Sequence, residues 1–82
     1  MRIQAYTVAA AEYYHAFPIE IQREIPFSEF LEGGDIGEMG WFWGKLNLNE
    51  RDEYKEKASN IRMTLEKSHI QPHQWIQLCA FS

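Results

Sequence analysis

Residues 41–48 read WFWGKLNL, and the alternation of side chains in this stretch decides the fold that the sequence predicts. On an extended chain, successive side chains point to opposite faces. Phe42 and Leu46 therefore fall on one face, and Trp41 and Trp43 fall on the other. Because alternation of this kind is typical of a β-strand, we predict a strand here that runs directly into a charged segment.

A long helix is predicted after this strand, from about residue 50 to residue 69. Asn49 is the expected N-cap, with Asp52 three residues later in the place of a capping-box acid. Pro72 is expected to mark the stop, because the residue before a proline is biased away from the helical conformation. The apolar residues that recur at the helical period, and would form one stripe, are Tyr54, Ala58, Ile61 and Leu65.

Three further segments are read as strands, and they cover residues 1–6, 19–25 and 74–82. Pro26 ends the second of them. The third is largely apolar on both faces, as is expected of a strand inside a sheet. Together with the strand over 41–48, these segments predict a small sheet of three to four strands.

Two stretches of the N-terminal half predict shorter helices. Residues 7–17 carry apolar side chains at helical spacing, with Thr7 as a cap and Pro18 as the stop. The same residues also fit a continuing strand, and we prefer the helix. Residues 26–34 predict one or two helical turns, whose inward-facing side chains would be Phe27, Phe30 and Leu31. The predicted fold class is α+β, in which the small sheet packs against the long helix and one or two short helices.

The composition predicts one compact domain over residues 1–82. The chain is 45% hydrophobic and contains one cysteine, Cys79, which cannot form an intramolecular disulfide. Chains of this length fall below the commonest domain size of about 100–150 residues. No apolar run approaches the roughly 20 residues that span a bilayer, and the first residues lack a signal-peptide pattern. The sequence therefore predicts a soluble protein of the cytoplasm.

The net charge of −4 is unevenly distributed along the chain. Residues 12–38 contain seven acids and one base, Arg23, for a local net charge of −6. Residues 39–82 contain five acids and six bases, for a net charge of +1. A one-sided acidic field repels nucleic acid phosphates and attracts basic protein surfaces. The alternative is a solvated face that only keeps a small protein soluble.

The predicted binding site joins these acids to the neighbouring tryptophans. Acids recur every three positions between residues 29 and 38, and two more lie on the polar face of segment 19–25. Tryptophan is a frequent anchor residue in protein interfaces. The alternatives are that the carboxylates point in several directions and that the long helix buries the tryptophans. The predicted site residues are Glu20, Glu24, Glu29, Glu32, Asp35, Glu38, Trp41 and Trp43.

No motif in the sequence predicts catalysis, a metal site or a cofactor. His69 and His73 are four residues apart, but Pro72 between them breaks the helix that would bring two zinc ligands to one face. The glycine-rich segment 33–40, GGDIGEMG, lacks both the calcium-loop pattern and the phosphate-loop pattern. Cys79 has no base nearby in sequence and is expected to be a packed, inert thiol.

These features predict a small acidic module that binds protein, and in particular an inhibitor of a basic protein that handles nucleic acid. Such a role needs a rigid fold, a charged patch and a few aromatic anchors, but no pocket and no cofactor. Size and charge are typical of phage and mobile-element proteins that block a defence complex, as anti-CRISPR proteins do, which would place the chain in the host cell cytoplasm. They are equally typical of immunity proteins and antitoxins that neutralise a basic toxin.

Two further alternatives stay open at this point. A single-stranded nucleic acid could stack on Trp41, Trp43 and Tyr54, although acids interspersed among the bases of the long helix weaken any basic patch. The bases that would contact phosphates are Lys45, Arg51, Lys55, Arg62 and Lys67. The strand predicted over 41–48 could also pair with a second copy and form a homodimer.

Overall fold

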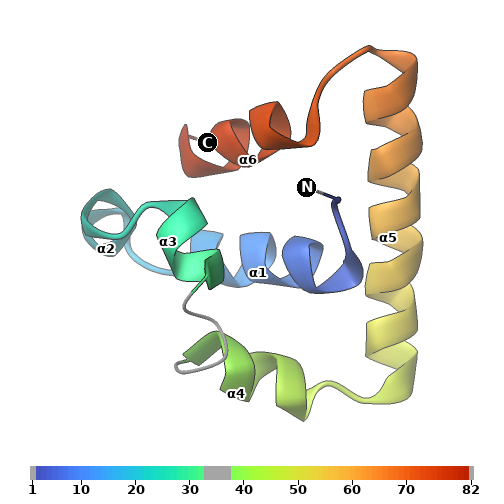
Figure 1. The fold of residues 1–82 in the computed structure, drawn as a ribbon. Coiled ribbons are helices and arrows are strands. Elements are labelled where there is room, and N and C mark those ends of the chain that lie inside the picture. The colour runs from blue at the N-terminus through green and yellow to red at the C-terminus, as the bar shows by residue number, and fades with distance from the viewer. Residues whose placement is uncertain (1, 33–37, 82) are drawn as a thin grey trace.

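The computed structural model of the chain describes residues 2–32 and 38–81. Within these residues it contains six α-helices and no β-strand, as Figure 1 shows. The helices are α1 (Ala5–His15), α2 (Ile19–Glu24), α3 (Phe27–Glu32), α4 (Glu38–Lys45), α5 (Leu48–Lys67) and α6 (Pro72–Phe81). The predicted α+β fold with a three- to four-stranded sheet is therefore wrong, and the described chain is all-helical.

The helices expected from helical spacing are confirmed. α5 contains most of the helix predicted over 50–69. α1 contains most of the helix predicted over 7–17, a stretch for which a strand was the alternative. α3 lies within the segment 26–34 that predicted one or two helical turns.

The segments predicted as strands belong to helices instead. Residues 19–25 contain α2, residues 41–48 lie mostly in α4, and most of 74–82 lies in α6. The end of the first predicted strand, residues 5 and 6, already belongs to α1. α2 and α4 have only six and eight residues. Over so short a stretch, alternating and helical patterns share many positions, and tertiary packing decides between them.

α6 begins at Pro72, which was predicted only as the stop of the long helix. Proline is favoured in the first turn of a helix, because its fixed φ angle suits the helix and its missing N–H would have had no partner there. The backbone N–H of Gln71 donates to the side-chain oxygen of Gln74 at 2.7 Å, which resembles half of a capping box. Pro72 therefore starts α6 after it has helped to end α5.

The cap of α5 is Asn47, two residues before the predicted Asn49. The side chain of Asn47 accepts from the backbone N–H of Glu50 at 2.8 Å, and the Glu50 carboxylate accepts from the backbone N–H of Asn47 at 3.1 Å. The sequence contains two candidate capping boxes, which are Asn47 with Glu50 and Asn49 with Asp52. The longer glutamate side chain reaches back over one turn, which favours the first box.

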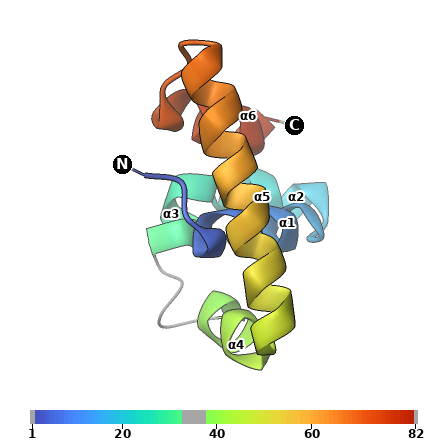
Figure 2. The same ribbon diagram turned by 90° about the vertical axis from the view of Figure 1, so that its right-hand side faces the viewer.

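α1 lies at the centre of the molecule. In Figure 1 it runs between α6 and α4, and the quarter turn of Figure 2 shows α5 crossing it. Ala9 and Ala10 are fully buried, and Ala58 of α5 is fully buried as well. Small side chains let helix backbones approach closely, so α1 can be surrounded by neighbours within a chain of 82 residues.

The apolar core has two clusters among the described residues, and α1 contributes to both. The first gathers α1, α3 and α6 around Tyr14, Phe27 and Ile76. The second gathers the entering chain, α1 and α5 around Ile3, Ala58 and Leu65. The first cluster holds α3 in place, and the acids of α2 and α3 lie outside it.

Candidate functional site

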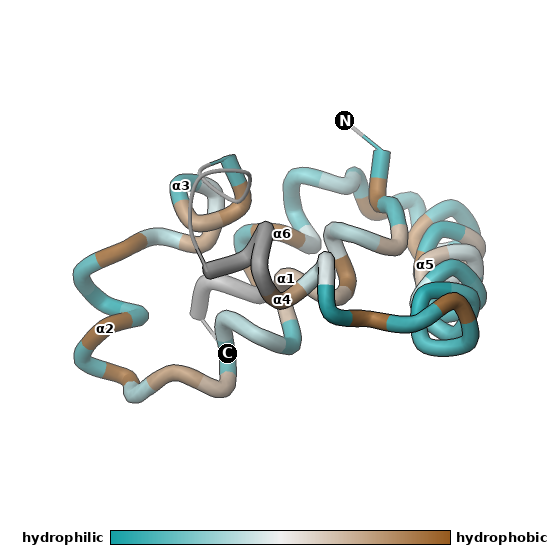
Figure 3. The backbone as a smooth tube through the Cα atoms, turned by 90° about the horizontal axis from the view of Figure 1, so that it is seen from below, coloured by the Kyte–Doolittle hydropathy of each residue, from teal (hydrophilic) through white to brown (hydrophobic). Residues whose placement is uncertain are grey.

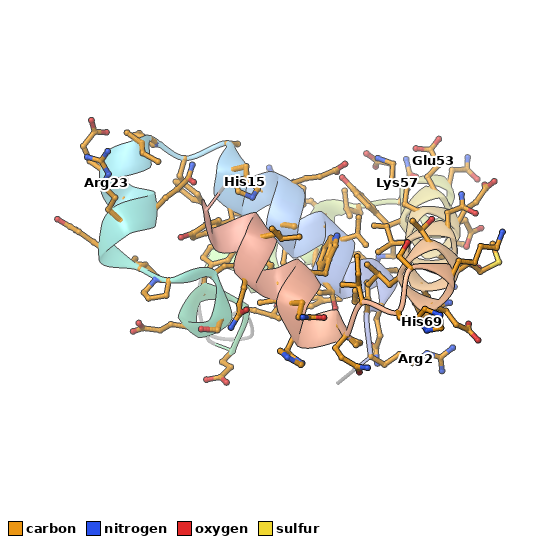
Figure 4. All side chains as sticks on the ribbon, turned by 90° about the horizontal axis from the view of Figure 1, so that it is seen from above. Arg2, His15, Arg23, Glu53, Lys57 and His69 are labelled. Carbon is orange, nitrogen blue, oxygen red and sulfur yellow. The ribbon has the colours of Figure 1, made fainter. Side chains whose placement is uncertain are left out.

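An acidic surface lies on α2 and α3, and we call it the α2–α3 surface. Its carboxylates are Glu20 and Glu24 on α2 and Glu29 and Glu32 on α3, and all four are exposed. One base, Arg23, lies among these four acids, which leaves a net charge of −3 over residues 19–32. Figure 4 shows the Arg23 side chain at the tip of α2, the end of the molecule farthest from α5.

None of these four carboxylates has a hydrogen bond or ion pair with another described residue. The described ion pairs lie elsewhere, between Lys55 and Asp52 and between Lys57 and Glu12. The charge of the α2–α3 surface is therefore not neutralised within the described chain, and its field extends into solvent.

α2 is held to α1, and to the segment between the two helices, by partly buried polar contacts. The hydroxyl of Tyr14 shares its proton between the carbonyl oxygens of Gln22 and Ile25, at 2.7 and 2.6 Å. The side-chain amide of Gln22 donates to the carbonyl of Phe17 at 2.8 Å. Tyr14 is almost fully buried, and burial raises the pKa of its hydroxyl, so the group stays a neutral donor at physiological pH.

The exposed surface of α2 is apolar as well as acidic. Ile19, Ile21 and Ile25 keep 49%, 41% and 39% of their surface exposed. Figure 3 shows hydrophobic and hydrophilic residues alternating along this part of the chain. Scattered apolar residues are normal on a protein surface, and these three exposed isoleucines leave apolar area between the carboxylates of α2. Isoleucines interleaved with carboxylates are suited to a partner surface that is both apolar and basic.

α3 is fixed by its aromatic residues. Phe27 is fully buried, and its ring centroid lies 5.3 Å from that of Tyr14. Phe30 and Leu31 are half-buried and pack against the same cluster. The prediction that these three residues face inward is confirmed, and Glu29 and Glu32 are left on the outer side.

The other predicted site residues do not extend this acidic surface. Trp43 is half-buried, and the rest lie wholly or in part outside the residues that the structure describes. Asp35 lies outside the described residues, and so do the side chains of Glu38 and Trp41, although both belong to α4. The strand prediction put positions 41 and 43 on one face. In a helix they differ by about 200° around the axis, so they do not share a face.

Trp43 lies at the junction of α1, α4 and α5. It is half-buried, and its ring meets the ring of Tyr6 edge-on at 5.6 Å. The guanidinium of Arg51 lies 5.2 Å from the Trp43 ring centre and donates to the Trp43 carbonyl at 3.0 Å. One residue earlier, Phe42 stacks on Tyr13 with ring centroids 4.4 Å apart. The structure therefore brings Trp43 to the core side of α4 rather than to the four exposed acids.

Arg51 and Arg62 were predicted to contact phosphates, and both are engaged within the protein. Arg51 binds the Trp43 carbonyl, and Arg62 donates to the carbonyl of Ile3 at 2.6 Å. Lys57 donates to Glu12 at 3.0 Å. Tyr54 is half-buried, and burial together with its hydrogen bond to Glu12 raises its pKa to about 12. Trp43 and Tyr54 are therefore both half-buried and packed within the protein, which disfavours the base stacking that the nucleic acid alternative requires.

A groove between α1, α5 and α6 was missed by sequence reasoning. It has a volume of about 730 Å³, and its lining includes Trp75 and the ion pair between Lys57 and Glu12. Burial raises the pKa of Glu12, but the hydrogen bonds from Tyr54 and Lys57 and the Lys57 charge outweigh it, so the pKa lies below its ordinary value. No local sequence pattern predicts this groove, because its lining residues are far apart in the sequence.

Within residues 2–32 and 38–81, no group of three or more histidine, cysteine, aspartate or glutamate side chains is arranged to hold a metal ion. The same residues include no helix with the length and apolar character needed to cross a bilayer. Comparison with protein-family models, with curated proteins and with solved structures found no match to this chain.

Proposed function

We propose that the chain is a small acidic module that binds a basic protein partner through the α2–α3 surface. The observation that carries this proposal is the combination on one end of the molecule of unpaired, exposed carboxylates and exposed isoleucines. Charge of one sign steers the encounter with an oppositely charged partner, and apolar side chains contribute buried area once contact is made.

The partner class follows from this chemistry. A protein that handles nucleic acid presents a basic surface for phosphates, and an acidic module can occupy that surface in place of the nucleic acid. We therefore propose that the chain inhibits such a protein, as an anti-defence protein of a phage or mobile element would, or as an immunity protein or antitoxin would. The lone Cys79 suits a reducing compartment, and we propose the cytoplasm.

The experiment is affinity capture from cell lysate followed by mass spectrometry, with three tagged forms of the full chain. The first is the wild-type protein. The second replaces the acids of the α2–α3 surface by glutamine, which removes charge and keeps side-chain size: Glu20→Gln, Glu24→Gln, Glu29→Gln and Glu32→Gln. The third removes four acids from α5 as a matched control: Asp52→Asn, Glu53→Gln, Glu56→Gln and Glu66→Gln.

A basic protein recovered with the wild type and the α5 control, but lost with the α2–α3 variant, is the expected result. Recovery should also fall as salt is raised, because screening weakens steering between exposed charges. Equal recovery of the same proteins by all three forms would overturn the proposal. Circular dichroism of each form keeps a loss of fold separate from a loss of binding.

A further inference from the structure

The lining residues of a second cavity come from the segment that precedes α1, the last turns of α5 and the start of α6. Figure 1 shows the end of α5 on the far side of the molecule from α2. The cavity encloses about 430 Å³, which falls in the range of roughly 300–1,000 Å³ for small-molecule sites. Its charged and titratable side chains are Arg2, Arg62, Glu66 and His69. In a chain with a net charge of −4, three basic side chains therefore line one cavity beside a single acid.

Arg62 is the fixed member of this group. Its Nη1 donates to the carbonyl oxygen of Ile3 at 2.6 Å, which ties α5 to the segment that precedes α1. Ile3 is itself fully buried, so the anchor is rigid. A guanidinium has five N–H donors in a planar fork. One of them is used by Ile3, and the fork keeps further donors for a ligand.

Arg2 and His69 are the other basic residues that line the cavity. Both are exposed, and Figure 4 shows them at the same corner of the molecule. Neither side chain makes a hydrogen bond or ion pair with another described residue. Glu66 also lines the cavity and makes no ion pair with a described base. The Arg2 guanidinium and the His69 imidazole are therefore not engaged by contact within the described residues.

The backbone at His69 supplies independent support. The residue has a φ of 57°, in the left-handed region that usually selects glycine. It closes α5 with the N–H of Ile70 bonded to Leu65 and its own N–H bonded to Glu66, at 2.9 and 3.2 Å. A side chain here costs conformational energy that glycine would avoid. A non-glycine residue with this φ angle, in the lining of a charged cavity, points to a use for its side chain.

We propose that this cavity binds a small organic phosphate. The phosphate group lies among Arg2, Arg62 and His69, and the apolar part of the ligand lies against Ile3, Leu65 and Ile70. A phosphate monoester carries nearly two negative charges at neutral pH, which two guanidinium groups can neutralise. The apolar wall favours an organic ester over the free ion, because the free ion gains nothing from apolar contact.

Isothermal titration calorimetry with three probes separates the parts of this proposal. Phenyl phosphate carries both an anion and an apolar ring, inorganic phosphate carries only the anion, and phenol carries only the ring. The full chain should bind phenyl phosphate about tenfold or more tightly than either of the other two. Equal affinity for phenol and phenyl phosphate would overturn recognition of the phosphate. Equal affinity for the two phosphates would overturn recognition of the organic part.

Variants locate the site. The double variant Arg2→Gln with His69→Asn removes two exposed groups, and asparagine is among the residues that best tolerate a positive φ. We expect it to weaken phenyl phosphate binding at least about tenfold, since charge-assisted hydrogen bonds are lost. The matched control, Lys55→Gln with Lys67→Gln, removes two charges of α5 that lie outside the cavity and should leave affinity nearly unchanged.

Glu66 gives a test in the opposite direction. Its carboxylate repels an anion in the cavity, so Glu66→Gln should tighten phenyl phosphate binding severalfold. A general loss of fold cannot produce tighter binding. Failure of the wild type to bind phenyl phosphate at 10 mM, about the weak limit of specific small-ligand binding, would overturn the proposal. Equal affinity of the double variant and the control would overturn it as well.

Discussion

α5 and the α2–α3 surface use the same kinds of charged residue in opposite ways. α5 carries five acids and five bases, and several of these bases bind α1, α4 or the chain that enters α1. Residues 19–32 carry four acids and one base, and none of those acids has a partner among the described residues. Charge on α5 helps to hold the fold together, whereas charge on α2 and α3 is available to something outside the chain.

The two regions also differ in how they are anchored. α5 has 20 residues, a capping box and a buried small residue, Ala58, against α1. α2 and α3 have six residues each and are attached through Phe27, Phe30 and the Tyr14 hydroxyl. Isolated helices this short are not stable in water, so α2 and α3 depend on these few contacts.

The largest expected effect is that of Phe27→Ala. Phe27 is fully buried and packs on Tyr14, and truncation of a buried phenylalanine usually costs about 3–5 kcal/mol of unfolding free energy. We expect urea denaturation to show a loss of this size. Phe17→Ala is the control, because Phe17 is only half-buried and should cost less. Equal losses for the two variants would contradict the assignment of Phe27 as the anchor of α3.

Ala58→Leu should be the next largest and tests the α1–α5 contact. Ala58 has no exposed surface, and added methylene groups in a packed core cost about 1–3 kcal/mol. The measurement is the free energy of unfolding in urea, with the exposed position Asn60→Leu as the control on the same helix. A neutral Ala58→Leu would mean that α5 packs less closely on α1 than the structure describes.

Tyr14→Phe should have a smaller and more local effect. The variant keeps the ring in the core and removes only the hydroxyl that binds the carbonyls of Gln22 and Ile25. Loss of such a bond costs about 1 kcal/mol, and it should fall mainly on α2. Amide hydrogen exchange is expected to speed up in residues 19–25 while α5 keeps its protection. Equally faster exchange in all helices would show that α2 does not unfold independently of the rest of the protein.

Tyr54→Phe should have the smallest effect, and it depends on pH. The Tyr54 hydroxyl is partly exposed to solvent. At neutral pH its hydrogen bond to Glu12 therefore contributes less than about 1 kcal/mol to the free energy of unfolding. Burial and this bond raise the pKa of Tyr54 to about 12 from an ordinary value of 10, so the neutral form is favoured in the folded protein. Its contribution is complete below pH 10 and is lost as pH rises toward 12. Wild-type stability should therefore fall relative to the variant across that range, and parallel pH profiles would contradict the contact.

Of the two regions compared, α5 was the better predicted from the sequence. α5 was recognisable because 20 residues with a regular apolar stripe leave no alternative to a helix, and only its cap was misplaced by two residues. The sequence also predicted the acidity of residues 12–38 and the inward-facing side chains of Phe27, Phe30 and Leu31.

The short segments could not be assigned in the same way. Ile19, Ile21 and Ile25 alternate as strand residues do, yet they lie on α2 and its end with their side chains largely exposed. Trp41 and Trp43 were expected to share a face, and the helical backbone of α4 separates them. Both segments were predicted to pair with neighbouring strands of a sheet, and the described residues contain no strand.

The sequence by itself determined the long helix, the segregation of acids into one half of the chain and the lack of a recognisable catalytic motif. These properties depend on local spacing and composition. Only the tertiary structure decided that α2, α4 and α6 are helices, that Trp43 packs against Tyr6, and that Arg2, Arg62 and His69 line one cavity. A helix of six to ten residues gains most of its stability from the surfaces it packs against, and those surfaces come from distant parts of the chain.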